Sequence, residues 1–399
     1  MSFFHAGKIR VMLIGGGGRE HAIAWSLSKS PKVELIICAP GNGGTARGST
    51  KIKNCDPDIK ATDLTGLLGV AETHRVDLVV PCSDSSIISG AVDFFETRGF
   101  RVFGPSKKAA KIEGSKSWAK AFMERHKIPT ASYQSFSSPS EASLFLQSQS
   151  TSRHVVKASG LAAGKGVFLC NTKEEAEDAV NKLMVERVFG EAGEEIIIEE
   201  FLVGRELSVT IITDGKVWRL FPVGQDAQRI YDGNLGPNTA FVGFICTGIM
   251  QTVDGPKLLE YNARFGDPEA QALFPLLDDA SDLADIMIAC TEAQLERVHM
   301  EFQPKAAISL VVASSGYPGA YRVGEFIDFG SLPQDVFVFH AGTSWAGDRL
   351  VTQGGRVLAV VCIADSTEEA IKGAYSGAQE IIFKGKYLRT DIGQILSSW

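Results

Sequence analysis

The sequence lacks the features of a secreted, membrane-spanning or cysteine-stapled protein. Its seven cysteines are scattered, no two have C-x-x-C spacing, and an odd number cannot all pair within one chain. The seven histidines are equally dispersed, so no zinc or haem site is indicated. No apolar run is long enough to span a bilayer, and residues 1–10 contain no signal-peptide core. We therefore expect a cytoplasmic protein that does not enter a membrane.

An excess of positive charge is also missing. Lysine and arginine number 40 against 47 aspartates and glutamates, so the net charge is −7. This balance argues against a general nucleic-acid surface and leaves room only for a local basic pocket. The 399 residues, 44% of them hydrophobic, suffice for two to four compact units.

Alternating strand and helix patterns at the start predict an α/β unit with a doubly wound parallel sheet. Its ligands are expected at the carboxyl ends of the strands. Strands are expected at 8–14, 33–38, 78–80 and 101–103, and helices at 19–28, 63–74 and 88–98.

The remaining patterns predict a core of two α+β subdomains and a small C-terminal α+β domain. A long helical stretch is expected over 107–126, followed by a β-helix-β-β-helix-β unit over about 130–200. The last domain contains few groups for chemistry and is expected to be structural. The predicted domains are 1–106, 107–303 and 304–399, with a lid over about 130–195.

The most informative segment is a strand, a loop of small residues and a second strand over 153–170. Lys157 lies in the first strand, and Lys165 stands between Gly164 and Gly166. Glycine lets backbone N–H groups approach an anion closely, and the ammonium groups add charge. Gly166 stands where a Walker motif needs Ser or Thr, so the segment predicts a phosphate grip on a hairpin. A hairpin with a flexible tip is the alternative.

A second glycine loop, Gly15 to Gly18, follows the first predicted strand. It does not fit the dinucleotide fingerprint, because Glu20 stands in the place of the third glycine. Four glycines at a helix N-terminus, followed by Arg19, suit a monophosphate better. A tight turn between strand and helix explains the loop equally well.

Two strand segments also contain candidate ligands. Glu260, Asn262 and Arg264 alternate along a predicted strand and therefore share one face. The two oxygen-bearing side chains suit magnesium, and the arginine suits the same phosphates. The strand ending in Glu199–Leu202 suits adenine and ribose. A solvated edge strand and an ordinary acidic strand end are the alternatives.

In order along the chain, these pieces resemble the phosphoribosylamine–glycine ligase (glycinamide ribonucleotide synthetase) family of ATP-grasp enzymes. The resemblance covers the chain nearly end to end. The matching stretches are Gly15–Ala24, Ala39–Thr45, Gly104-Pro105, Glu113–Lys116, Lys157–Val167, Glu199–Leu202, Gly236–Thr239, Leu259–Glu269, Ser315–Pro318, His340–Thr343 and Gly354–Val357.

The resemblance implies ATP-dependent ligation of glycine to 5-phosphoribosylamine through a glycyl phosphate, in de novo purine synthesis. It also implies Mg²⁺ or Mn²⁺ as cofactor and a monomer. Carried over by position, Lys116, Lys157, Gly164, Lys165, Gly166, Glu199, Glu200 and Leu202 would bind ATP, while Gly16, Gly17, Gly18, Arg19, Asn42, Gly44, Thr45, Asp226, Arg229 and Asn238 would bind the other substrates; Glu260 and Asn262 would bind the metal, and Arg264 and Lys157 would be catalytic.

Three positions depart from the family's pattern. The family usually has Gly-Pro-Glu where this chain has Pro81-Cys82-Ser83. It usually has Gln-Asp-His-Lys-Arg where Gln225–Arg229 of this chain has Gln-Asp-Ala-Gln-Arg. After Thr239 the family has Gly-Gly-Met-Gly and several dozen further residues, so an internal deletion is indicated there. The departures face the sugar-phosphate and glycine side. An internally deleted, impaired nucleotide-binding relative and another ATP-grasp carboxylate–amine ligase are therefore the alternative functions.

Overall fold

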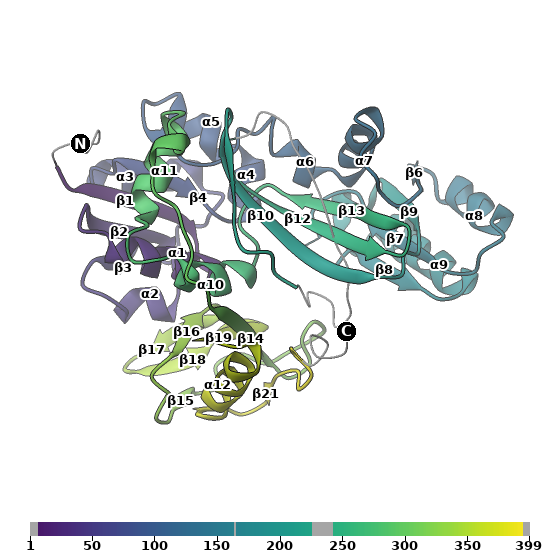
Figure 1. Cartoon of the computed structure of the whole chain (residues 1–399). Coiled ribbons are helices and arrows are strands. Elements are labelled where there is room, and N and C mark those ends of the chain that lie inside the picture. Colours follow the sequence, from purple (N-terminus) through teal and green to yellow (C-terminus); the bar gives the residue numbers. More distant parts are fainter. Residues whose placement is uncertain (1–6, 163–164, 226–241, 394–399) are drawn as a thin grey trace.

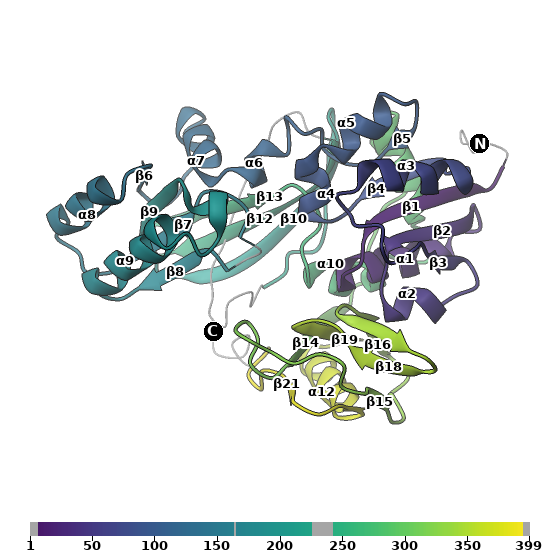
Figure 2. The same ribbon diagram turned by 180° about the vertical axis from the view of Figure 1, so that it is seen from behind.

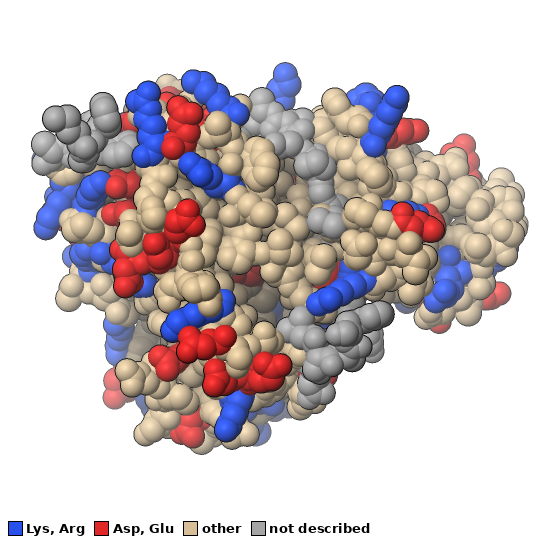
Figure 3. Space-filling model, viewed as in Figure 1, with Lys and Arg blue, Asp and Glu red and all other residues tan. Residues whose placement is uncertain are grey.

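The structure, a computed structural model, describes residues 7–162, 165–225 and 242–393, which form three units (Figure 1). The C-terminal unit packs beside the N-terminal unit, and the hairpin sheet at the far end of the middle unit extends away from both (Figures 1 and 2). Acidic and basic side chains are interspersed over the face shown in Figure 3. Across the described ranges, no helix combines the length and apolar character needed to cross a bilayer.

The N-terminal unit contains the predicted doubly wound sheet. Its strands run parallel in the order β3-β2-β1-β4-β5. Val11 and Leu13 of β1 pack in one hydrophobic cluster with α1, whereas Met12 and Ile14 pack in another on the opposite face. The elements are β1 (Ile9–Gly15), α1 (Gly18–Lys29), β2 (Val33–Pro40), α2 (Gly43–Arg47), β3 (Ile52–Asn54), α3 (Leu64–Thr73), β4 (Leu78–Pro81), α4 (Asp84–Ser89), α5 (Ala91–Glu96) and β5 (Arg101–Val102).

The middle unit has two four-stranded sheets. The hairpin sheet has the order β6-β9-β7-β8, and its elements follow the predicted β-helix-β-β-helix-β order. The long-strand sheet has the order β11-β10-β12-β13 and is antiparallel. The elements are β6 (Tyr133–Phe136), α8 (Pro139–Ser148), β7 (His154–Ala158), β8 (Val167–Cys170), α9 (Lys173–Val180), β9 (Ile196–Glu200), β10 (Arg205–Asp214), β11 (Trp218–Leu220), β12 (Val242–Thr252), β13 (Gly255–Asn262), α10 (Glu269–Leu273) and α11 (Leu283–Thr291).

The helical stretch expected over 107–126 begins only at Lys111 and is divided in two. Two helices, α6 (Lys111–Gly114) and α7 (Lys116–Arg125), are separated by Ser115. Ser115 has an extended backbone, and its Oγ accepts a hydrogen bond from the N–H of Trp118 at 3.2 Å. The serine is therefore an N-cap that starts a new helix.

The C-terminal unit is a sheet of order β16-β19-β14-β21 with α12 packed on it. A β17–β18 hairpin and a short β15–β20 pair complete it. The elements are β14 (Ala306–Ser314), β15 (Asp328–Phe329), β16 (Val336–His340), β17 (Thr343–Ala346), β18 (Arg349–Thr352), β19 (Arg356–Ala364), α12 (Thr367–Gln379), β20 (Ile381–Ile382) and β21 (Lys386–Tyr387).

Candidate active site

Strands β7 and β8 form the predicted hairpin. The N–H of Ala158 donates to the carbonyl of Gly166 at 2.8 Å beside its loop. A Cβ on Gly166 would lie 2.6 Å from the Cβ of Ala162, so the close approach requires glycine. Gly164 lies outside the described residues.

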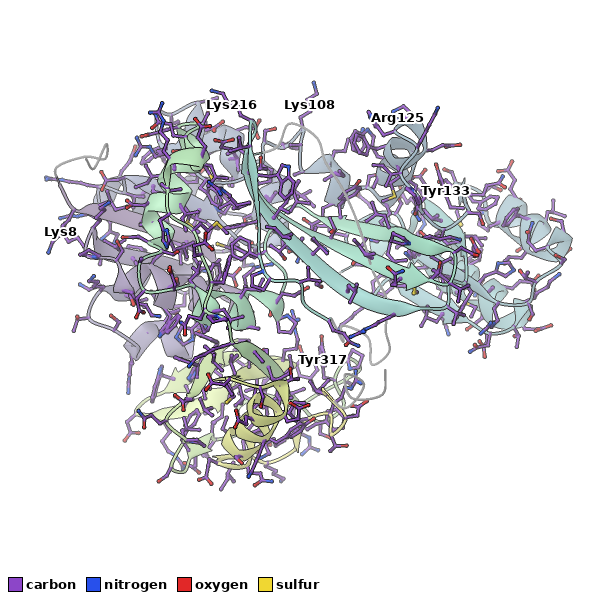
Figure 4. The ribbon with its side chains drawn as sticks, viewed as in Figure 1. Lys8, Lys108, Arg125, Tyr133, Lys216 and Tyr317 are labelled. Carbon is purple, nitrogen blue, oxygen red and sulfur yellow. The ribbon has the colours of Figure 1, made fainter. Side chains whose placement is uncertain are left out.

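The hairpin loop reaches the C-terminal unit. Lys165 Nζ lies 5.8 Å from the centre of the Tyr317 ring, a cation–π distance. Figure 4 shows Tyr317 where the C-terminal unit approaches the middle unit. The hairpin therefore lies over the space between the two units.

A cavity opens between the hairpin sheet and the long-strand sheet. Lys157, Glu199, Glu200 and Leu202, all predicted to bind ATP, line it. The cavity thus combines charged groups with an apolar wall, as the phosphates and base of a nucleotide require. The other lining residues are Val155, Phe201, Met250 and Leu259.

Two buried lysines share the Glu199 carboxylate. Lys157 Nζ lies 2.8 Å from Oε2, and Lys120 Nζ lies 3.2 Å from Oε1. Burial raises the pKa of the Glu199 carboxyl, but the two ammonium groups outweigh it and hold that pKa below its ordinary value. Glu199 is therefore ionised. Lys120 was not among the predicted site residues, although it lies one helical turn after Lys116.

Lys116 connects the hairpin with β13. Its backbone N–H donates to the carbonyl of Ser159 at 2.9 Å, and its Nζ donates to the carbonyl of Gly160 at 3.4 Å. Burial lowers the pKa of Lys116, the Glu260 carboxylate opposes this, and the Lys157 ammonium adds to it. The structure thus brings the residues predicted for phosphate and for metal into one electrostatic neighbourhood.

Glu260 and Asn262 occupy alternate positions on β13, as predicted. They pair with Gly248 and Cys246 of β12. The Asn262 Oδ1 accepts from Arg264 Nη2 at 3.0 Å and keeps a second lone pair. One carboxylate and one amide oxygen fit Mg²⁺ or Mn²⁺ as two of its ligands. Within the described ranges no group of three or more His, Cys, Asp or Glu could hold a metal, so water and substrate would supply the other ligands.

Two carboxylates that sequence reasoning missed hold Arg264. Its Nε lies 2.7 Å from Asp84 Oδ1 and 3.1 Å from Glu113 Oε1. Burial raises the pKa of Glu113, whereas the Arg264 and Arg19 guanidinium groups lower the pKa of Asp84 against its own burial. The available signal for Asp84 was its place three residues after the end of β4, at the expected ligand edge of the sheet.

The glycine loop is hydrogen-bonded to α1, the helix that follows it. The N–H of Gly17 donates to Glu20 Oε2 at 2.6 Å, and Arg19 Nε lies 2.8 Å from Glu20 Oε1. A Cβ on Gly15 would lie 2.7 Å from the Glu20 side chain. The Gly17 N–H that was predicted to meet a phosphate is therefore bound to a carboxylate in this structure, whereas Arg19 also reaches the carbonyl of Phe265 at 3.1 Å.

Asn42 ties the glycine loop to the C-terminal unit. Its Oδ1 accepts from the N–H groups of Gly44 and Thr45 at 2.9 and 3.1 Å. Its Nδ2 donates to the carbonyls of Gly17 and His340 at 3.2 and 2.7 Å. Asn42 therefore joins the backbone of the glycine loop to the backbone of the C-terminal unit. The remaining predicted substrate residues, Asp226, Arg229 and Asn238, lie outside the described residues.

The C-terminal unit contributes a charged group to the same region. Arg356 of β19 donates to the carbonyl of Asp267 at 2.7 Å and forms an ion pair with its carboxylate at 3.2 Å. Asp267 Oδ1 also accepts from Gln271 at 2.7 Å. Sequence reasoning did not select Arg356, although it lies in the matching stretch Gly354–Val357.

A buried histidine pair between the outer units predicts acid sensitivity. The backbone N–H of His340 donates to His21 Nδ1 at 2.8 Å, so that nitrogen is unprotonated. Burial lowers the pKa of His21 to about 3 and that of His340 to about 4. Below about pH 6.5 the unfolded chain takes up protons that the folded chain does not. The free energy of unfolding should then fall by about 1.4 kcal/mol per pH unit for each histidine.

Urea unfolding at pH 7 and pH 5 measures this loss. The variant His21→Asn keeps an acceptor for the His340 N–H but does not titrate, so its unfolding free energy should fall less steeply with acid. Equal slopes in the variant and the wild type would contradict this explanation.

Comparison with known families gives matches along most of the chain. The phosphoribosylglycinamide synthetase N domain matches residues 9–113, the ATP-grasp (A) domain residues 114–247 and 238–270, and the C domain residues 307–395. A phosphoribosylamine–glycine ligase of Chlorobaculum tepidum is 41% identical over 425 aligned positions, covering 96% of this chain and 99% of that protein. A bifunctional purine biosynthetic protein of Pichia angusta is also 41% identical, and the match covers 96% of this chain and 53% of that protein.

Solved structures agree with these matches. The chain superimposes on the crystal structure of phosphoribosylamine–glycine ligase from Thermotoga maritima with a TM-score of 0.79 and 30% identity, covering 96% of this chain and all of that one. A biotin carboxylase domain of Hydrogenobacter thermophilus, solved with MgADP, has a TM-score of 0.74 at 14% identity, which supports the fold alone. The predicted fold, with its N-terminal parallel sheet, ATP-grasp core and small C-terminal domain, is confirmed.

Proposed function

Because the chain belongs to the phosphoribosylglycinamide synthetase family, we propose that it ligates glycine to 5-phosphoribosylamine at the expense of ATP in purine biosynthesis. The cavity under the β7–β8 hairpin supports this most directly, because a buried Lys157–Glu199 pair and an apolar wall meet there. The products would be glycinamide ribonucleotide, ADP and phosphate. The family domains, matched at residues 9–113, 114–270 and 307–395, support predicted boundaries near 106 and 303.

The reaction needs no protein nucleophile. A carboxylate oxygen of glycine attacks the γ-phosphorus of ATP, the bond to the bridging oxygen breaks, and ADP leaves. The amine of phosphoribosylamine then attacks the glycyl carbonyl, phosphate leaves, and the nitrogen loses a proton. Catalysis is therefore positioning and charge neutralisation.

The side chains suit these tasks. We assign Lys116 and Lys157 to the ATP phosphates, with the Gly160–Gly166 loop above them. Arg264, held by Asp84 and Glu113, is directed to the acyl phosphate. Glu260 and Asn262 would hold the Mg²⁺ or Mn²⁺, which when bound neutralises phosphate charge. Arg19 and the glycine loop are assigned to phosphoribosylamine.

Release of ADP tests this function. The purified chain should release ADP only when ATP, Mg²⁺, glycine and freshly formed phosphoribosylamine are all present, and omission of glycine is the matched control. Glycine-independent release at the same rate would contradict the ligase assignment. Phosphate release with a different carboxylate in place of glycine would instead support another ATP-grasp ligase.

A second function is supported by one observation. The alignment with the Chlorobaculum ligase has 425 positions, more than the 399 residues of this chain, so that relative has residues that are missing here. The two segments of the A-domain match meet at residues 238–247, where the deletion after Thr239 is predicted. An impaired relative would bind ADP but show no glycine-dependent turnover.

We further propose a cytoplasmic monomer, for which light scattering should give about 43 kDa.

A further inference from the structure

Lys120 is buried to 1% exposure in the wall behind the nucleotide cavity. Its Nζ lies 3.2 Å from Glu199 Oε1 and donates to Thr130 Oγ1 at 2.6 Å. Thr130 in turn donates to the carbonyl of Leu258 at 2.5 Å. Lys157 and Glu199 line the cavity, but Lys120 does not. The ammonium group of Lys120 is therefore committed to protein partners and does not touch a ligand.

The burial of this lysine needs an explanation, because a buried charge is costly unless its pairing is useful. Lys157 and Glu199 by themselves form a neutral pair, in which the carboxylate neutralises the charge of the lysine. With Lys120 bound to the second carboxylate oxygen, the three groups have a net charge of +1. The surplus charge lies where Lys157 faces the cavity.

We propose that Lys120 is a positioning residue for the nucleotide phosphates. By neutralising Glu199 from behind, it leaves the Lys157 ammonium available to a phosphate instead of fully paired with protein. This inference rests on the proposed nucleotide site. It assigns to Lys120 no contact with ATP.

Four other charged groups surround the cluster. Lys116 at the start of α7 acts on Lys157, and Glu260 on β13 acts on Lys120. Glu200, beside Glu199 on β9, lines the cavity and forms an ion pair with Lys257 at 3.6 Å. These two positive and two negative charges cancel and leave the net charge of the cluster at +1. Tyr133, opposite Glu199 in the β6–β9 ladder, has its hydroxyl bound to Glu124 at 3.0 Å and so does not pair with the carboxylate (Figure 4).

The decisive measurement compares ADP with adenosine in the variant Lys120→Met. Methionine matches the apolar stem but removes the charge. We expect ADP to bind about tenfold more weakly and adenosine to bind within about twofold of wild type, because only ADP uses the surplus charge. A parallel loss for both ligands would indicate a merely structural lysine and overturn the proposal, as would unchanged ADP affinity.

A second substitution in the same cluster should reverse the effect. The double variant Lys120→Met/Glu199→Gln lacks the carboxylate that neutralises the Lys157 ammonium. ADP should therefore bind to the double variant more tightly than to Lys120→Met. Additive losses in the double variant would contradict the proposal. If Lys120→Met does not fold, Lys120→Gln tests the same arrangement. It keeps a hydrogen-bond donor toward Glu199 and Thr130 but removes the charge, so it should also weaken ADP about tenfold without affecting adenosine.

The pH profile gives a readout that packing does not change. In Lys120→Met the buried Glu199 has one ammonium partner in place of two, so its pKa should rise and its carboxyl should take up a proton at a higher pH than in the wild type. Relative to wild type at each pH, ADP affinity of the variant should therefore improve toward pH 6. A constant ratio would overturn the proposal. Failure of the wild type to bind ADP would reject the proposed function instead.

Discussion

The variant Lys157→Ala is expected to lose turnover, with kcat/KM lower by about a thousandfold, because one charge-assisted phosphate contact is removed from a buried site. Lys157 lines the cavity and lies 2.8 Å from Glu199, so its loss also leaves one buried carboxylate oxygen without its partner. ADP should bind much more weakly as well. Calorimetric titration with ADP and the ADP-release assay measure the two effects separately.

The matched control for this variant is Lys182→Ala. Lys182 lies in the same part of the middle unit, but its side chain is 43% exposed and forms a surface ion pair with Asp178. Its removal should change neither binding nor turnover. If Lys157→Ala bound ADP as wild type does, the assignment of Lys157 to the phosphates would be wrong.

The variant Glu260→Lys should abolish turnover and the effect of metal together. Reversal of this charge removes one of the two oxygen ligands that we propose on β13. It also places a second cation near Lys116, whose pKa the Glu260 carboxylate raises. The direct readout is ADP affinity with and without Mg²⁺. Wild type should bind ADP more tightly when Mg²⁺ is present, and the variant should show no difference.

Asp254→Lys provides the same charge change on the exposed turn before β13 and should behave as wild type. A Glu260→Lys variant that still responds to Mg²⁺ would move the metal site away from β13. The measurement does not need turnover, so it remains informative if the chain proves to be an impaired relative.

Local patterns explain which parts of the site could be predicted. The hairpin around Lys157 and Gly166 is formed by residues close in sequence, and the alternation of Glu260 and Asn262 is a property of one strand. Each could be derived from spacing and chain geometry alone. The resemblance to a known family then placed these segments in one active site.

The residues that were missed depend on contacts between distant segments. Lys120 binds Glu199 from a different element, and Asp84 binds Arg264 across 180 positions of the chain. A single sequence indicates that a lysine lies on a helix but not which buried carboxylate it meets. The break at Ser115 was missed for a different reason, since the helix-forming residues on both sides concealed a capping serine.

The contact between the N-terminal and C-terminal units restricts the choice of amino acid more on the N-terminal side than on the C-terminal side. The two groups of residue 340 that bind the N-terminal unit belong to its backbone: its N–H is bound by His21 and its carbonyl by Asn42. Its ring pairs within its own unit, where Nδ1 lies 3.1 Å from Thr343 Oγ1. Any amino acid except proline supplies those two groups, provided that it fits beside Gly44. A chimaera that exchanges the C-terminal unit needs the correct backbone path there, but not the same side chain.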